Sequence, residues 1–287
     1  MIEIENVTKI YPNGHQALNN LNIQLSTGMF GLLGPNGSGK TTLMRILATL
    51  LRPTNGCVFI FGNDLSTSVG QDKTRNLLGY LPQDTGLHPA LTVEQELDYI
   101  AILKQIASGS ERAKHIGKIL EQVGLSQARH KKVHTLSGGM KRRLGIALAL
   151  LGEPRLIIVD EPTAGLDPAE RVRFRNLLHE LAGDRIVILS THIVEDISQI
   201  CTDLAVLHEG SLLFRGSPAE LMRQVEGMVW TTPESVDAVS LISSKRTNEG
   251  IENRVFSNTS PGPSSRLVKP TLEDAYLWLV RQGKTGN

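Results

Sequence analysis

The sequence predicts an α/β fold built on a parallel, doubly wound sheet. Two short apolar runs, Leu156–Val159 and Ile186–Leu189, are continuous rather than alternating, which is typical of parallel strands covered on both faces. Helix-like stretches at 140–151 and 169–182 lie between or beside them. A glycine-rich loop at 34–39 separates an apolar run from another helix-like run. Strands that alternate with helices around such a loop indicate a doubly wound core.

The first segment of the chain predicts an antiparallel β subdomain in front of this core. Apolar residues alternate with polar ones over residues 2–10 and again over 17–25, as expected for strands with one buried face. Asn13-Gly14 between the two runs is a turn signal of the hairpin type.

The glycine-rich loop has the pattern of a phosphate-binding loop, G-x-x-x-x-G-K-[ST], in the strand–loop–helix context that such a loop requires. Small residues let consecutive backbone N–H groups surround an anion, and the following helix directs its positive dipole end to the same place. The lysine can reach the β- and γ-phosphates, and the threonine hydroxyl after it can ligate Mg²⁺. The sequence therefore predicts a P-loop NTPase core, with the nucleotide held by Gly34, Pro35, Asn36, Gly37, Ser38, Gly39, Lys40, Thr41 and Thr42.

A helical insertion is expected from about residue 84 to 150. Apolar residues recur every three or four positions over 93–103 and 116–123, and Gly124 then reads as a helix stop. A small accessory region is expected over 226–287. Its residues 231–270 are polar, and its last helix begins with Thr271 as the cap and Asp274 in the capping-box position.

Composition limits the classes of function. The chain has 287 residues and a formal net charge of +1, so it lacks the basic footprint of a nucleic-acid-binding protein. Its two cysteines, Cys57 and Cys201, have no metal-ligand spacing and favour a reducing compartment. We find no signal peptide at the start and no apolar run long enough to span a bilayer.

Further motifs follow the phosphate loop in a fixed order. They are Gln83, Leu136-Ser-Gly-Gly-Met140, Leu156 to Asp160-Glu161, Ala164-Gly-Leu-Asp167 and His192, with an aromatic residue, Tyr11, near the N-terminus. Together they resemble the ATP-binding subunit of ABC transporters over residues 1–225. We call Leu136-Ser-Gly-Gly-Met140 the signature. The signature with the basic residues that follow it, and the segment Thr271-Leu-Glu-Asp-Ala-Tyr276 near the end of the chain, resemble the branch that serves separate export-type permeases.

The residue types suit ATP hydrolysis. An acidic side chain that ends a buried strand is costly unless it is paired or bound to metal, so Asp160 is expected in a Mg²⁺ shell that Thr41 and Gln83 complete. Glu161 follows it directly and can polarise the attacking water. His192 can hydrogen-bond the γ-phosphate or position that water, and Lys40 completes the predicted catalytic set with Gln83.

A second anion-binding helix start lies at Ser137, Gly138 and Gly139. The resemblance implies that it closes over the nucleotide of another subunit, with Asp167 at the interface. Tyr11 can stack on the adenine ring. Met140 departs from the family pattern, which has glutamine there; the backbone donors of the two glycines are unaffected.

The resemblance implies an ATPase that energises a membrane transporter by ATP-driven closure of a head-to-tail dimer. The resemblance to the export-type branch implies that this transporter is an exporter. It implies ATP and Mg²⁺ as cofactors, and an integral-membrane permease and a second copy or a paralogue as partners, without nucleic acid. It places the chain at the cytoplasmic face of the cell membrane as a peripheral subunit. The alternative is a soluble ABC-type ATPase that acts on ribosomes or DNA. Against it, the chain has a single phosphate loop and no room for a long coiled coil between Lys40 and Ser137.

Overall fold

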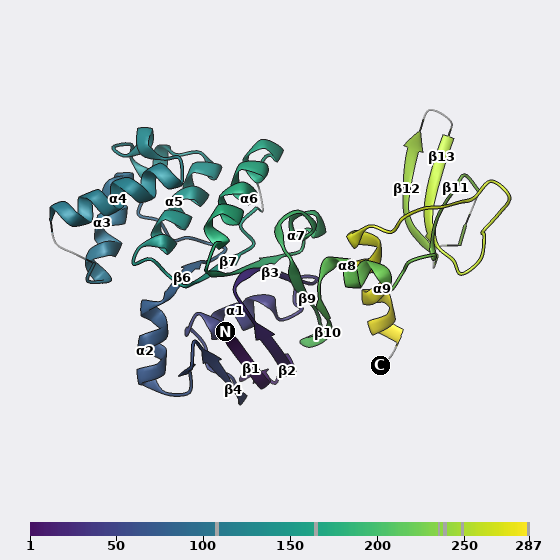
Figure 1. The fold of residues 1–287 in the computed structure, drawn as a ribbon, viewed down its shortest axis with the longest axis horizontal. Coiled ribbons are helices and arrows are strands. Elements are labelled where there is room, and N and C mark those ends of the chain that lie inside the picture. The colour runs from purple at the N-terminus through teal and green to yellow at the C-terminus, as the bar shows by residue number, and fades with distance from the viewer. Residues whose placement is uncertain (107–108, 164–165, 235, 238–239, 248–249, 286–287) are drawn as a thin grey trace. The chain divides into compact units, whose positions relative to one another are not determined.

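The computed structural model describes residues 1–106, 109–163, 166–234, 236–237, 240–247 and 250–285. The chain divides into two compact units, residues 1–212 and 213–287, which are described separately (Figure 1). The short helix α8 (Pro218–Arg223) lies in the second unit and packs against the last helix of the chain. None of the described helices is long and apolar enough to cross a membrane.

A six-stranded sheet forms the centre of the first unit, in the order β10-β9-β3-β8-β7-β6. Strands β3, β6, β7, β8 and β9 run parallel to one another, so their carboxyl ends lie along one edge. This is the predicted parallel sheet. The strands are β3 (Gly28–Leu33), β6 (Leu78–Leu81), β7 (Leu156–Asp160), β8 (Ile186–Thr191), β9 (Asp203–His208) and β10 (Ser211–Gly216).

Helices cover both faces of this sheet, as the continuous apolar runs predicted. On one face, Ile158 and Ile188 share a core with Leu43 and Met44 of α1. On the other, Gly31 of β3 lies directly against Ile197 of α7, so close that an added Cβ would collide with that side chain. The helices of the first unit are α1 (Lys40–Leu47), α2 (Ser68–Asn76), α3 (Val93–Leu103), α4 (Ser110–Gln122), α5 (Gly138–Leu150), α6 (Pro168–Ala182) and α7 (Val194–Ile200).

An antiparallel sheet packs on the other side of α1, as predicted for the N-terminal segment. Its order is β2-β1-β4-β5, from β1 (Ile2–Ile10), β2 (Gln16–Leu25), β4 (Asn55–Ile60) and β5 (Asn63–Asp64). Ile2, Ile4 and Val7 are buried, and so are Leu21 and Ile23 on the neighbouring strand. The predicted insertion is helical, with α3, α4 and α5 between β6 and β7.

The second unit holds a small antiparallel sheet, which the sequence did not predict. Its order is β12-β13-β11-β14, from β11 (Val229–Thr232), β12 (Leu241–Thr247), β13 (Gly250–Phe256) and β14 (Arg266–Leu267). Helix α9 (Leu272–Thr285) follows this sheet and is the last element of the unit. The predicted capping box is confirmed: the backbone N–H of Thr271 donates to the Asp274 carboxylate, and the Asp274 N–H donates to the Thr271 hydroxyl.

Asp274 also joins α9 to β13. Its carboxylate is almost fully buried and accepts two hydrogen bonds from Arg254, at 2.8 and 2.6 Å. Burial alone would raise the pKa of this carboxyl, but the bonds from Arg254 and Thr271 outweigh it and hold the pKa below its ordinary value. The stability that this carboxylate contributes is therefore present above about pH 4, its unfolded pKa, and is lost as the pH falls through the lower folded pKa.

We expect Asp274→Ala to destabilise the second unit by about 3–5 kcal/mol, because the variant leaves the Arg254 guanidinium without its partner. Thermal unfolding at neutral pH would measure the loss. Glu273→Ala, at an exposed neighbouring position of the same helix, is the control and should unfold like the wild type. Equal unfolding curves for the two variants would show that the Arg254–Asp274 pair does not stabilise this unit.

Candidate functional site

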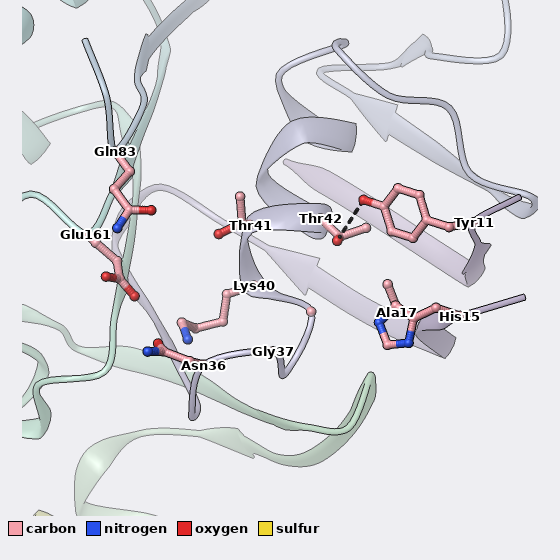
Figure 2. A pocket seen from close by; sticks show the side chains of 11 residues that line it. Tyr11, His15, Ala17, Asn36, Gly37, Lys40, Thr41, Thr42, Gln83 and Glu161 are labelled. Carbon is pink, nitrogen blue, oxygen red and sulfur yellow. Dashed lines mark hydrogen bonds between the residues drawn. The ribbon is translucent and has the colours of Figure 1, made fainter. Parts of the chain in front are cut away.

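A cavity of about 350 Å³ lies at the carboxyl edge of the parallel sheet. In Figure 2, Lys40 and Thr41 stand at its middle, Gln83 and Glu161 on one side, and Tyr11 and His15 on the other. Ligands of open α/β sheets bind at this edge, outside the carboxyl ends of the strands. The cavity is lined by Tyr11, His15, Ala17, Asn36, Gly37, Gly39, Lys40, Thr41, Thr42, Gln83 and Glu161.

The phosphate loop follows β3 and ends where α1 begins, as predicted. Gly39 is the N-cap of α1 and has a φ of +101°, in the left-handed region that favours glycine. A Cβ at this position would also collide with the backbone oxygen of Ala17. Gly34 and Ser38 are buried behind the loop, whereas Asn36 and Gly37 are exposed at its outer side. The helix start consequently faces the cavity with free N–H groups, an arrangement that binds phosphate.

Lys40 holds the loop together from within. Its ammonium donates to the backbone oxygens of Gly34 and Pro35, at 2.7 and 3.0 Å. Burial lowers the pKa of Lys40 below its ordinary value, while the nearby carboxylates of Glu161 and Asp160 favour the charged form. A phosphate in the cavity would add negative charge beside this ammonium and stabilise its charged form.

The Asp160 carboxylate is suited to a metal shell. It ends β7, is 1% exposed, and accepts a 2.7 Å hydrogen bond from the Ser190 hydroxyl at one oxygen only. Its other oxygen, Oδ2, has no hydrogen-bond partner among the described residues. A buried carboxylate oxygen without a partner is costly, and a hydrated cation would satisfy it. Thr41 and Gln83, the other predicted Mg²⁺ residues, both line the cavity. These donors fit Mg²⁺.

Glu161 faces the cavity, next to His192. Its backbone has a φ of +46°, an uncommon conformation for a residue with a side chain, and its N–H donates to Ser190 across the sheet. The turn directs Asp160 inward and lets Glu161 line the cavity. His192 follows β8, and its Nδ1 lies 3.3 Å from the Glu161 carboxylate. This pair can hold and orient a water molecule beside the phosphate loop.

The β1–β2 loop closes the other end of the cavity. The Tyr11 hydroxyl hydrogen-bonds that of Thr42 at 3.2 Å, and the Tyr11 ring is parallel to that of His15, with centroids 6.4 Å apart. Tyr11 is where the sequence predicted it, but His15 and Ala17 were missed as lining residues. The only available signal was their closeness to Tyr11 in the sequence, with His15 in the β1–β2 loop and Ala17 at the start of β2, since neither belongs to a motif.

The signature residues are not among those that line this cavity. Ser137 caps α5, and its hydroxyl accepts a hydrogen bond from the N–H of Met140. Ser137 and Gly138 are exposed, whereas Gly139 is buried against the Glu170 carboxylate. Asp167 caps α6 by accepting from the Glu170 N–H, and it is exposed. The preceding Ala164 and Gly165 lie outside the described residues.

The chain is similar in sequence to proteins of a known family. A family profile described as ABC transporter matches residues 18–164. An uncharacterized ABC transporter ATP-binding protein of Synechocystis, sll0415, is 37% identical and covers 98% of this chain and 85% of its own length. The Nod factor export ATP-binding protein I of Cupriavidus metallidurans is 35% identical and covers 77% of this chain and 73% of its own.

A solved structure gives the same result for the fold. The dimeric, post-hydrolysis state of the ATP-binding cassette MJ0796, bound to ADP and Pi, matches with a TM-score of 0.69 and 29% identity, over 76% of this chain and 98% of that one. The predicted nucleotide binding and ATPase activity are therefore confirmed at the level of the family. The chain belongs to the ABC transporter family, in which it is an ATP-binding subunit that hydrolyses ATP.

Proposed function

We propose that this chain powers export through a separate membrane permease, by closing with a second subunit over two ATP molecules and reopening after hydrolysis. One observation carries this proposal. The cavity holds the groups for phosphate, metal and water, yet the anion-binding start of α5 is not part of its lining and is exposed at Ser137 and Gly138. A site with this composition is complete only when another subunit supplies those donors.

In the proposed reaction, Glu161 accepts a proton from the attacking water, while His192 orients the Glu161 carboxylate through the contact of its Nδ1. Lys40 and the N–H groups of the phosphate loop stabilise charge that develops on the γ-phosphate. Tyr11 stacks on the adenine ring at the far end of the cavity. Thr41, Gln83 and Asp160 would hold Mg²⁺, which neutralises charge on the β- and γ-phosphates when it is bound.

The proposed dimer is symmetric, so that each phosphate loop faces the signature of the other subunit. Because ATP would bind the closed dimer more tightly than the open one, ATP shifts the population toward closure. The MJ0796 cassette is dimeric in its ADP- and Pi-bound structure, which supports the same arrangement for this chain. The second subunit is another copy or a paralogue.

We expect Ser137→Arg to block this closure and to leave ATP binding by the monomer unchanged. The substituted side chain would place bulk and charge where a phosphate of the partner must fit, far from the chain's own cavity lining. Fluorescent-nucleotide titration and size-exclusion chromatography in Mg-ATP would measure the two properties. An affinity loss in the monomer as large as that of Lys40→Ala would contradict the assignment across subunits.

Relatives support the proposed export and the permease partner. The Nod factor relative is named for export, and the family profile is that of ABC transporters. We propose a peripheral place at the cytoplasmic face of the cell membrane, bound to integral-membrane permease subunits. We also propose residues 1–225 as the ATP-binding domain and residues 226–287 as an accessory region.

The permease would bind beside α3. In α3, Val93 and Leu97 are fully buried. The exposed apolar side chains of this helix are Tyr99, Ile102 and Leu103, at 45%, 51% and 62%. Leu87 and Leu91 are half-buried in the segment that joins Gln83 to α3. An apolar surface next to the Gln83 segment suits a short amphipathic helix of the permease.

We expect Leu87→Glu or Leu103→Glu to leave the ATPase activity of the isolated chain intact and to uncouple it from transport. A charge on the docking surface would weaken permease binding without reaching the nucleotide cavity. Transport and ATPase assays on the reconstituted complex would compare the two activities. Leu97→Glu is the buried control and should lose folding. Normal transport in both surface variants would remove α3 from the docking surface.

A further inference from the structure

Arg142 of α5 links three parts of the molecule: the helix that begins at the signature, the segment that contains Gln83, and the turn at Glu161. Its side chain is half-buried and points from the signature helix toward the carboxyl ends of β6 and β7. Nη1 donates to the backbone oxygens of Gln83 and Pro82, at 2.7 and 3.3 Å, and Nη2 donates to the backbone oxygen of Glu161, at 3.1 Å. One guanidinium therefore bridges the Gln83 segment and the Glu161 turn.

The bridge acts on Glu161, the cavity residue that directly follows β7 and has a strained backbone. Glu161 has a φ of +46°, which disfavours a residue with a Cβ, so neighbouring contacts must hold it there. Two contacts of its own peptide groups do so: the N–H donates to Ser190 at 3.0 Å, and the C=O accepts from Arg142. Without Arg142, the turn would relax toward an ordinary conformation and the carboxylate would move relative to the phosphate loop.

We infer that Arg142 is a positioning residue for hydrolysis, which holds Glu161 and Gln83 in fixed places against the signature helix. This inference rests on the roles proposed above for Glu161 and Gln83. Arg142 is not among the residues that line the cavity, so it does not touch the nucleotide. Its effect is exerted on the backbone of two residues that do line it. The start of the same helix carries Ser137, so movement of α5 when a partner's phosphate binds there would be passed to both residues.

The chemistry of the bridge requires arginine. A guanidinium presents its N–H donors in a rigid, planar fork, so two terminal nitrogens can serve two carbonyls at once. An ammonium is a single point of charge on a flexible stem and would serve one side of the bridge. The order of activity should therefore be arginine, then lysine, then alanine.

The test is steady-state ATPase kinetics of Arg142→Ala and Arg142→Lys in the full-length chain. We expect Arg142→Ala to lower kcat about 10- to 100-fold, because small displacements of catalytic groups cost that much. The KM for ATP should stay within about twofold, because no contact to the bound nucleotide is removed. Arg142→Lys should recover part of kcat. The control is Lys104→Met, which removes another cation that donates to a backbone oxygen, that of Leu151, away from the cavity; it should keep wild-type kinetics.

A kcat for Arg142→Ala within about twofold of the wild type would overturn the inference, as would a raised KM with an unchanged kcat. If Arg142→Ala does not fold, Arg142→Lys decides: a lowered kcat with unchanged KM supports the bridge, and an unchanged kcat overturns it. Glu161→Gln separates this inference from the proposed function. Near-normal turnover in Glu161→Gln would contradict the role of Glu161 itself. Loss of turnover in Glu161→Gln, together with wild-type kinetics in the Arg142 variants, would contradict only the positioning role of Arg142.

Discussion

Glu161→Gln should bind ATP with wild-type affinity and lose nearly all turnover. The substitution keeps the size of the side chain and its place beside His192, whose Nδ1 lies 3.3 Å from the Glu161 carboxylate, but it removes the negative charge that polarises the attacking water. Removal of a general base typically costs about 10²–10⁴-fold in rate. A steady-state ATPase assay with a parallel fluorescent-nucleotide titration measures both quantities on the same preparation.

A matched control for this result is Glu209→Gln, which also replaces a glutamate at a left-handed backbone position, with a φ of +48°, but outside the cavity lining. It should hydrolyse ATP at the wild-type rate. Turnover by Glu161→Gln within a few-fold of the wild type would rule out Glu161 as the base.

Lys40→Ala should lose ATP affinity rather than turnover alone. The ammonium lies in the phosphate loop and is the only lysine that lines the described cavity. A hydrogen bond to a charged group contributes about 1.5–3 kcal/mol, so affinity should fall roughly 10- to 150-fold. The variant also loses the hydrogen bonds from Nζ to the backbone oxygens of Gly34 and Pro35, which hold the loop in shape.

Lys118→Ala on α4 removes an exposed cation far along the chain from the loop and should bind ATP normally. Isothermal titration with ATP in the presence of Mg²⁺ measures both variants. Unchanged affinity in Lys40→Ala would mean that the phosphates do not lie beside this ammonium.

The sequence predicted the parts of the fold in which local chemistry and tertiary structure agree. The phosphate loop has one stable geometry, because its glycines permit it and the flanking strand and helix need it. Strands β7 and β8 could be recognised from their continuous apolar runs, because both faces of these strands are buried. The capping box of Thr271 and Asp274 is local, so the four residues 271–274 were enough to predict it.

The second unit could not be predicted in the same way. Strand β12 has the sequence Leu241-Ile-Ser-Ser-Lys-Arg-Thr247, with few apolar residues, and lies at the edge of the sheet. Its residues 243–246 are exposed. The buried apolar positions of this sheet include Val229 and Val255, which are far apart in sequence. Pairing between distant, mostly polar strands leaves no periodic signal.

The candidate site was also only partly predictable from the sequence. The motifs predicted Gln83 and Glu161, but nothing in their spacing indicated that Arg142 connects their backbones. From the sequence alone, an arginine in an amphipathic helix is interpreted as a solvent-exposed charge, because only the fold shows which carbonyl groups lie beside it. His15 likewise became a cavity residue only when the β1–β2 loop lay beside α1.

The molar mass of Glu161→Gln in Mg-ATP, measured by light scattering during size-exclusion chromatography, tests the proposed mechanism most directly. The proposal requires that blocked hydrolysis traps the closed state, so the variant should elute with twice the mass of one chain in Mg-ATP and as a monomer without nucleotide. Adding Ser137→Arg to the same variant should return it to a monomer that still binds ATP. A Glu161→Gln protein that is saturated with ATP and remains monomeric would contradict closure of two identical subunits over the nucleotide.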